Sequence, residues 1–250
     1  LDAGMPRIPR IFCPELPDEV AGVTLPDGAS RHVVKVLRMG TGDALRLFDG
    51  RGREHDATIV EAAGRRARVT LLAAREPAAE SPLKVSLLQA VGRGERMDLV
   101  VQKATELGVS SIVPVLSNRS MVKLEGERAD RRRSHWESVA AGACEQCGRA
   151  FLPEIAAPCT LETALGQTPA DWTRLTPDPA AEQPMAALDP PGIGLAVLIG
   201  PEGGLDDGER SLAEAAGFQP VRLGPRVLRT ETAAIAGLAL AQGLWGDLRR

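Results

Sequence analysis

The hydrophobic pattern of this chain changes near residue 80. Before that point, apolar and polar residues alternate in short segments, which is typical of half-buried strands. The predicted strands cover residues 7–12, 44–48, 56–61 and 67–72, the last two in hairpin order. A helix that Ser30 caps is expected to turn Val33, Val36 and Leu37 inward. These elements predict a small β-barrel-like domain over residues 5–78, and the residues ahead of Met5, which resemble a cloning remnant, are left outside it.

After residue 83, strand patterns alternate with helix patterns. The predicted strands cover 85–91, 112–116, 172–175, 196–199 and 221–223. An apolar stripe from Met97 to Leu107 predicts a helix that Gly108 ends, and a long helix is expected over 131–149. Asp206 with Glu209 forms a capping-box pattern, and Thr230 is expected to cap the last helix. This order predicts an α/β domain over residues 83–250, with a mostly parallel sheet and helices on both faces.

Two of the predicted strands end in loops that carry glycine and proline. Gly200-Pro201-Glu202-Gly203-Gly204 follows the strand 196–199, and Gly224-Pro225-Arg226 follows the strand 221–223. Loops at the carboxyl ends of parallel strands are where open α/β sheets bind small molecules, although such loops are often plain turns. The first loop fits neither Gly-x-x-x-x-Gly-Lys-Ser/Thr nor Gly-x-Gly-x-x-Gly, so a phosphate cradle and an ordinary dinucleotide site are disfavoured.

The composition narrows the class of protein. The chain has 250 residues, 44% of them hydrophobic, and a net charge of −3, as in globular proteins. No segment resembles a membrane span or a signal peptide, so we expect a cytoplasmic protein. The four cysteines are too few for a disulfide framework, and Cys144 with Cys147 lacks the further ligands of a metal site. The net negative charge argues against indiscriminate binding of polyanions but leaves a local RNA-binding surface open.

Four motifs carry a resemblance to a known family. They are LIGPEGG over 198–204, LGPRVLRTETA over 223–233, ACEQCGR over 143–149, and RMG over 38–40 with FDG over 48–50. Together they resemble the ribosomal RNA small subunit methyltransferase E family of the SPOUT class, over nearly the whole chain from Met5. Gly-Pro-Glu-Gly-Gly alone would indicate only the wider SPOUT class.

The resemblance implies a fold, a reaction and partners. It implies a PUA-like domain followed by a domain with a deep trefoil knot, and a homodimer whose active sites lie near the subunit interface. It implies S-adenosylmethionine as the methyl donor, no metal, and N3 of a uridine in 16S rRNA of the small ribosomal subunit as the acceptor. The proline-rich segment 171–190 departs most from the pattern that we expect of the family.

The chemistry at N3 suggests roles for charged residues near the two loops. N3 of uracil becomes nucleophilic as its proton leaves, and the negative charge then spreads onto the flanking carbonyl oxygens. Glu202 and Glu231 are candidate proton acceptors, and Arg226 and Arg229 are candidate stabilisers of the anion. Ion pairs among these four side chains are the alternative interpretation.

The resemblance also suggests which residues contact the donor and the RNA. Candidate donor contacts are Leu198, Ile199, Gly200, Pro201, Gly203, Leu223, Gly224, Pro225, Leu228 and Thr230. Candidate contacts to RNA phosphates are Arg7, Arg10, Arg31, Lys35, Arg38 and Arg119, although basic residues on a helix often lie only on a solvated face. Three other functions stay open: another SPOUT methyltransferase acting on tRNA ribose or guanine, a non-catalytic RNA-binding or ribosome-assembly factor, and a nucleotide-binding protein.

Overall fold

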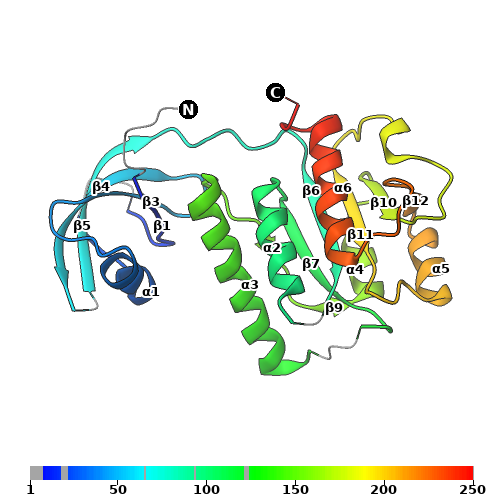
Figure 1. Cartoon of the computed structure of the whole chain (residues 1–250), viewed down its shortest axis with the longest axis horizontal. Helices are drawn as coiled ribbons and strands as arrows, with labels where there is room; N and C mark the ends of the chain where they lie inside the picture. Colours follow the sequence, from blue (N-terminus) through cyan, green and yellow to red (C-terminus); the bar gives the residue numbers. More distant parts are fainter. Residues whose placement is uncertain (1–7, 18–21, 65, 93, 121–123, 250) are drawn as a thin grey trace. The chain divides into compact units, whose positions relative to one another are not determined.

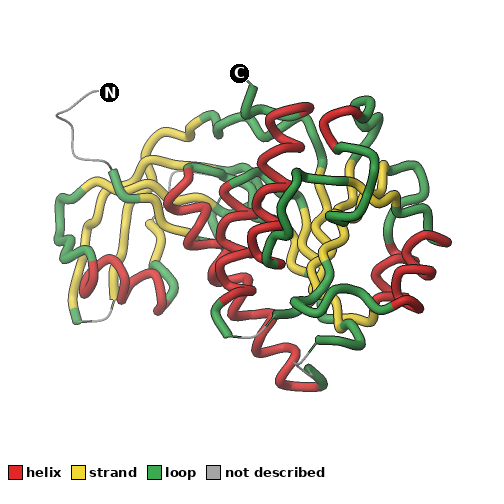
Figure 2. Tube along the Cα trace, turned by 45° about the vertical axis from the view of Figure 1, so that its right-hand side comes forward, coloured by secondary structure: helices red, strands yellow, loops and turns green. Residues whose placement is uncertain are grey.

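The computed structural model describes residues 8–17, 22–64, 66–92, 94–120 and 124–249 (Figures 1 and 2). The chain divides into two compact units. The first unit contains the residues up to Ala79 together with Ala141–Leu152, and the second contains Glu80–Ala140 and Pro153–Arg250. Residues 141–152 therefore group with the first unit, although they lie within the sequence range 83–250 expected for the second domain.

The first unit is built on a five-stranded sheet in the order β1-β3-β4-β5-β2. Its strands are β1 (Arg10–Phe12), β2 (Gly22–Thr24), β3 (Ala44–Phe48), β4 (Glu54–Ala63) and β5 (Arg66–Arg75). β1 pairs with β3 in parallel, and the other pairs are antiparallel. The sheet is strongly curved (Figure 1), but among the described residues β1 and β2 form its two edges and do not pair. The predicted β-barrel-like unit is therefore an open, curved sheet in the described residues.

The helix of the first unit differs from the prediction. α1 (Asp27–Arg31) continues into a π-helical turn, η1 (His32–Val36). Ser30 lies inside α1 and is buried, because its hydroxyl donates to the carbonyl of Leu25 and accepts the backbone N–H of Ala67. It is therefore not a helix cap. The wider π turn also changes the faces of the helix: Val33 is buried as predicted, whereas Val36 is 64% exposed.

The carboxyl-terminal end of α3 (Gly126–Cys147) is held in the first unit by hydrogen bonds from β1. The Arg10 guanidinium donates to the backbone carbonyls of Cys144 and Arg149, and the Phe12 N–H donates to the Glu145 carboxylate at 2.9 Å. Because these contacts join positions more than 130 residues apart, no local pattern in the sequence indicates them.

The second unit is an α/β structure with an entirely parallel sheet in the order β12-β10-β11-β6-β7-β8, with β9 also pairing with β7. Its strands are β6 (Val85–Ala90), β7 (Ser111–Leu116), β8 (Glu154–Ile155), β9 (Cys159–Thr160), β10 (Thr173–Pro177), β11 (Leu195–Ile199) and β12 (Gln219–Val221). The helices besides α3 are α2 (Arg96–Glu106), α4 (Leu161–Gln167), α5 (Asp207–Ala215) and α6 (Thr230–Trp245), with a short 3-10 turn, η2 (Met185–Ala187). The predicted parallel sheet is confirmed.

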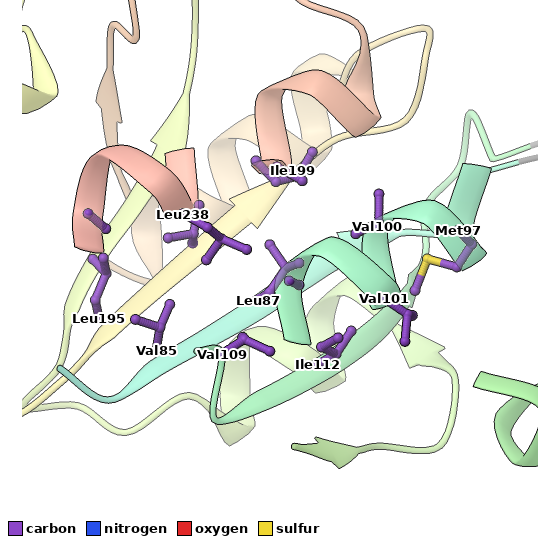
Figure 3. Packing of buried hydrophobic residues seen from close by; sticks show 14 of the residues in the cluster. Val85, Leu87, Met97, Val100, Val101, Val109, Ile112, Leu195, Ile199 and Leu238 are labelled. Carbon is purple, nitrogen blue, oxygen red and sulfur yellow. The ribbon is translucent and has the colours of Figure 1, made fainter. Parts of the chain in front are cut away.

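Helices cover both faces of this sheet. Side chains of successive strand residues point to opposite faces, so the apolar residues of the central strands need a helix layer on each side. On one face, Leu87 of β6 and Leu195 of β11 pack with Val100 of α2 and Leu238 of α6 (Figure 3). On the other face, the side chain of Leu198 packs in a second cluster to which α4 and α5 contribute. β6 and β11 are buried along their whole length, so they form the centre of the unit and their carboxyl ends are rigidly placed. Among the described residues, no helix combines the length and the apolar character that a membrane crossing requires.

Candidate active site

The loop that follows β11, residues 200–206 and hereafter the first loop, contains a tight turn that requires glycine. The N–H of Gly204 donates to the carbonyl of Pro201 at 2.9 Å, and Gly204 has φ 69°. A Cβ on Gly200 would lie 3.2 Å from the backbone nitrogen of Leu205. Glycine is therefore needed at one position for its dihedral angle and at the other for close approach of the backbone.

The loop that follows β12, residues 222–229 and hereafter the second loop, is held by the segment before η2. Arg222 donates its N–H to the carbonyl of Gln183 at 2.8 Å and accepts the N–H of Met185 at 3.0 Å. This pairing ends β12 at Val221, two residues before the predicted end. Gly224 has φ 155°, a value that only glycine adopts readily, and the next residues project outward, with Val227 83% exposed.

Thr230 links the two loops. Its hydroxyl donates to the carbonyl of Gly200 at 2.7 Å and accepts from the Gln89 side-chain amide at 3.1 Å. The prediction that Thr230 caps α6 is therefore wrong: the cap position is Arg229, and no side chain there accepts a helix N–H. The Thr230 hydroxyl forms hydrogen bonds to residues at the carboxyl ends of β6 and β11 and, among the described residues, none within its own helix.

A third loop, residues 117–120 after β7, is fastened to the start of α5. The predicted capping box is confirmed, since Asp206 and Glu209 exchange backbone N–H bonds at 2.8 and 3.0 Å. Glu209 also accepts the N–H of Asn118 at 2.8 Å, and Asn118 donates its side-chain amide to Asp206 at 2.9 Å. The hydrogen bonds from Glu209 and Asn118 hold the pKa of Asp206 below its usual value.

The first and second loops border a cavity of about 470 Å³. Its lining includes Thr176–Pro179 at the end of β10, Ile199 of β11, residues of the first loop other than Gly203 and Asp206, residues of α5, and Val227–Thr230 with Ala233. A smaller cavity of about 70 Å³ shares Pro177–Pro179 and adds Leu223, Gly224 and Arg226. The larger volume is in the range of small-molecule sites, and apolar walls beside a few polar groups are typical of such sites. The described part of the chain holds no cluster of three His, Cys, Asp or Glu side chains suited to a metal ion.

Charged side chains surround the larger cavity. Glu202 lines it and forms an ion pair with Arg96 of α2 at 2.5 Å. Arg226 and Arg229 are exposed, and neither takes part in an ion pair among the described residues. The proposed alternative, in which these arginines pair with Glu202 or Glu231, is therefore not found there. One carboxylate oxygen of Glu231, Oε2, is buried and has no hydrogen-bond partner among the described residues.

Comparison with known proteins gives the family. Residues 79–242 match the family described as RNA methyltransferase domain, and residues 25–72 match the RNA methyltransferase PUA domain. Ribosomal RNA small subunit methyltransferase E of Buchnera aphidicola subsp. Schizaphis graminum is 32% identical over 242 residues, covering 97% of this chain and 98% of that protein. The chain belongs to the ribosomal RNA small subunit methyltransferase E family.

Solved structures of similar proteins agree with this family. Ribosomal RNA small subunit methyltransferase E of Neisseria gonorrhoeae, solved with bound S-adenosylmethionine, is 37% identical and has a TM-score of 0.90. A methyltransferase structure from Legionella pneumophila, solved with the bound cofactor, is 39% identical and has a TM-score of 0.92. Each alignment covers 96% of this chain and 99% of the other. The amino-terminal unit of this family member is therefore PUA-like, as predicted.

The structure brings most of the predicted donor contacts to the cavities. The cavity of about 470 Å³, which is the larger cavity by comparison with that of about 70 Å³, is lined by Ile199, Gly200, Pro201, Leu228 and Thr230. A third cavity, of about 550 Å³, lies on the second loop and is lined by Leu223, Gly224 and Pro225. Gly203 is not among the lining residues, although Gly204 is. Leu198 was expected at the donor, but it is fully buried in the cluster with α4 and α5, because its side chain points to the opposite face of the sheet from Ile199.

Two of the predicted RNA contacts of this family member, Arg10 and Arg119, make contacts within the protein. Arg10 was expected at a phosphate, but its side chain is only 7% exposed, pairs with Glu54 at 3.0 Å and lies over the ring of Phe48. That prediction is wrong, because the guanidinium is fully used inside the first unit. Arg119 supports the first loop by donating to the carbonyl of Gly203 at 2.9 Å.

The remaining basic candidates of the first unit lie on its surface. Three of them are exposed: Arg31 at the end of α1, Lys35 on η1, and Arg38 shortly after η1. Arg38 has φ 55°, which is uncommon for a residue with a side chain. Arg7 lies outside the described residues. The exposed group is therefore available to a partner, and the unusual backbone at Arg38 fixes the direction in which the chain leaves η1.

Several residues that shape the site of this family member could not be predicted from local sequence patterns. Arg96, Asn118 and the segment Thr176–Pro179 carried no local signal, since each acts through a partner distant in the sequence. Gln89 did carry a signal: it is a polar residue within a fully buried strand, close to the carboxyl end where ligands bind.

Proposed function

We propose that this protein transfers the methyl group of S-adenosylmethionine to N3 of a specific uridine in 16S rRNA. The observation that carries the proposal is the cavity between the first and second loops, at the carboxyl ends of parallel strands, in a chain of this methyltransferase family. Relatives with 37% and 39% identity over 96% of the chain are solved with this donor bound.

The residues of the cavity fit the donor. The glycines at 200 and 204 let a ligand approach the backbone of the first loop, and Leu228, Ile199 and Ala233 provide apolar wall for an adenosyl group. When bound, S-adenosylmethionine supplies an activated methyl group on a sulfonium, so no metal is required for the transfer. The protein then acts mainly by positioning the acceptor and by managing the proton and the charge.

We assign the role of proton acceptor to Glu202 rather than Glu231. Glu202 lines the larger cavity, and its ion pair with Arg96 holds the carboxylate at that wall, whereas Glu231 is not among the lining residues. A Glu202→Gln variant is expected to lower kcat by about 10²- to 10⁴-fold with an unchanged donor Kd. Glu231→Gln is the matched control, and a larger loss of kcat in that variant would reverse the assignment.

Arg229 is the better placed of the two arginines to stabilise the uracil anion. It lines the larger cavity with Glu202, while Arg226 lines the smaller one. A guanidinium remains charged and can address a carbonyl oxygen with more than one N–H. Because both side chains are exposed in the absence of RNA, they are free to reach the base as it enters. Arg229→Lys is expected to keep part of the activity, and Arg229→Met to lose more.

The RNA substrate is bound by the first unit in this proposal. Arg31, Lys35 and Arg38 form an exposed basic group suited to phosphates, which position an RNA without specifying its bases. The N3 edge is blocked whenever uracil is paired, so the target base is drawn out of its local structure before reaction. The small ribosomal subunit in the cytoplasm is the proposed substrate and location.

A homodimer is supported by the surface of α6. From Thr232 to Trp245 this helix has no charged residue, and its apolar side chains are only partly covered on one side. The partly exposed residues are Ile235, Ala236, Ala239, Leu240 and Leu244. A helix that is apolar all round is normally buried, here against a second copy. Light scattering is expected to give a dimer for the parent and a monomer for Ala239→Glu.

The trefoil knot and the domain limits complete the proposal. We place the PUA-like domain at residues 5–78 and the knotted methyltransferase domain at 83–250, with residues 141–152 of that range grouped with the first unit. Support for the knot comes from the second loop, which pairs with the segment before η2 and borders cavities walled by the loops after β10 and β11. Pulling the unfolded chain from its ends is expected to give a shorter extended length than an unknotted chain of equal size.

The decisive experiment is methylation of small ribosomal subunits with labelled S-adenosylmethionine, followed by nucleoside analysis. N3-methyluridine is the expected product. A methyl group on ribose or on guanine would favour another SPOUT activity. If the folded protein bound neither the donor alone nor the donor with subunits, the non-catalytic RNA-binding interpretation would replace the proposal.

A further inference from the structure

Gln89 is a buried amide in the centre of the second unit. It lies on β6, opposite Ile199 of β11 and Pro114 of β7 in the sheet, and it is 1% exposed. Its side-chain nitrogen donates to the carbonyl of Ala90 at 3.0 Å and to the Thr230 hydroxyl at 3.1 Å. Gln89 does not line the larger cavity, so it would act on a ligand there through Thr230.

The chemistry of the amide fixes the direction of this chain of hydrogen bonds. The amide nitrogen only donates, so the Thr230 oxygen accepts from it and the single hydroxyl proton is directed elsewhere. That proton is donated to the carbonyl of Gly200 at 2.7 Å. The amide therefore determines the orientation of the hydroxyl, and the hydroxyl holds the first residue of the first loop to the first residue of α6.

We infer that Gln89 is a positioning residue for methyl transfer, which sets the spacing of the two donor-binding loops by orienting the Thr230 hydroxyl toward Gly200. This inference rests on the proposed function, since it concerns the same donor site. Gly200 and Thr230 both line the larger cavity, so a change in the bond that joins them alters the wall that contacts the donor.

A purely structural role for Gln89 explains the contacts less well. The oxygen of the same amide, Oε1, is buried without a hydrogen-bond partner among the described residues. A buried polar group that is only partly satisfied is less favourable than an apolar side chain of similar size. Neighbouring positions of β6 carry such apolar side chains, so stability alone would favour one at this position too.

The test compares variants that change the direction of the hydrogen bonds with variants that conserve it. In Gln89→Glu the carboxylate accepts from Thr230 and draws its proton away from Gly200, whereas Gln89→Met leaves the hydroxyl free to keep that bond. Thr230→Val removes the hydroxyl at nearly constant shape, and Thr230→Ser retains it. Thr168→Val is the matched control, because the Thr168 hydroxyl donates to a backbone carbonyl of α4, away from both loops.

Calorimetry with S-adenosylmethionine and steady-state kinetics with small ribosomal subunits provide the readouts. We expect Gln89→Glu and Thr230→Val to weaken donor binding by about tenfold and to raise the donor KM, with the KM for subunits unchanged. Thr168→Val is expected to bind like the parent. Thr230→Ser is expected to keep more affinity than Thr230→Val, and Gln89→Met to lie between the parent and Gln89→Glu.

Two results would overturn the inference: parent-like donor binding by Gln89→Glu, or equally weak binding by Thr230→Ser and Thr230→Val. Should Gln89→Glu fail to fold, the Thr230→Ser and Thr230→Val pair still decides. Failure of the proposed function is distinguishable, because the parent itself would then bind no donor, with or without subunits.

Discussion

Asn118 donates its backbone N–H to the Glu209 carboxylate at 2.8 Å, across 91 positions of the sequence. Glu209 is only 4% exposed, and its other oxygen accepts the N–H of Asp206 and the Ser117 hydroxyl. The Glu209 carboxylate therefore completes the capping box of α5 and also fastens the loop after β7 to the loop after β11. This arrangement holds the first loop in place where it forms a wall of the larger cavity.

Replacing Glu209 with glutamine should loosen the first loop. An amide has one accepting oxygen and presents N–H groups where the carboxylate accepts from Asp206 and Ser117, so at least one buried bond is lost. We expect the free energy of unfolding to fall by about 1–3 kcal/mol, measured by urea unfolding, and donor affinity to fall with it. Glu162→Gln is the control, because Glu162 is an exposed glutamate in the first turn of α4. Equal losses in the two variants would contradict this explanation.

Local patterns predicted most elements of the second unit because each depends on neighbouring residues, whereas β8, β9 and α4 were not predicted. The capping box of α5 and the glycine after α2, with φ 77° at Gly108, follow from spacings of a few residues. The side chains of Thr230, Ser30 and Arg10 were misinterpreted for the opposite reason. Each satisfies a group that is distant in the sequence, and a local rule assigns it to its own helix or to solvent.

The candidate site followed from the sequence where backbone geometry alone defines it. Glycines that end a buried strand indicate a turn at the carboxyl edge of the sheet, and both loops lie there. Which side chains line the cavity depends on the face of the sheet to which they point. Leu198 and Ile199 are neighbours in the motif, but a strand directs them to opposite faces, and only Ile199 reaches the cavity.

The two adjacent glycines of the first loop should respond differently to alanine. Gly204 has φ 69°, so Gly204→Ala is expected to cost about 1–2 kcal/mol of stability and to weaken donor binding. Gly203 is outside that region, and a Cβ there would meet the Arg119 side chain at an ordinary 3.5 Å, so Gly203→Ala should stay within about 0.5 kcal/mol of the parent. Thermal unfolding and donor titration check both variants, and a more harmful substitution at Gly203 would contradict the assigned turn.

Asp49 should make the stability of the first unit depend on acid. Burial raises the pKa of this carboxyl, but hydrogen bonds from the N–H groups of Arg51 and Arg53, and from the Arg53 side chain, outweigh it and lower the pKa. A depressed pKa means that the stabilisation is complete above the unfolded value of about 3.9 and is lost as pH falls through the folded value.

Asp49→Asn tests this dependence. At pH 7 the variant is expected to be less stable than the parent by about 1–3 kcal/mol, and the difference should shrink below about pH 4. Urea unfolding, followed by circular dichroism at intervals of about one pH unit between about pH 3 and pH 7, gives the difference in free energy of unfolding between the variant and the parent. The exposed Asp171→Asn variant is the control. A difference that stays constant with pH would rule out the carboxylate as its source.

Basic residues of the first unit should divide into those that stabilise the fold and those that bind RNA. Arg10→Met leaves the 6%-exposed Glu54 with the more distant Arg46, at 3.6 Å, as its one ion-pair partner among the described residues, so a loss of about 3 kcal/mol in stability is expected. Charge reversal at Arg31 and Lys35, which are exposed, should leave the melting temperature nearly unchanged.

RNA binding should depend on Arg31 and Lys35 rather than on Arg10. Removing the phosphate-binding charge of Arg31 or of Lys35 is expected to reduce the slope of log K against log salt by about 0.7–0.9 for each residue, while folded Arg10→Met keeps the parent slope. Filter binding to small ribosomal subunits between about 50 and 200 mM salt measures this slope. Donor titration of the same variants is the internal control, because Arg31 and Lys35 belong to the first unit and the donor cavity to the second. A parent-like slope in the charge-reversal variant would assign the phosphate-binding role to other residues.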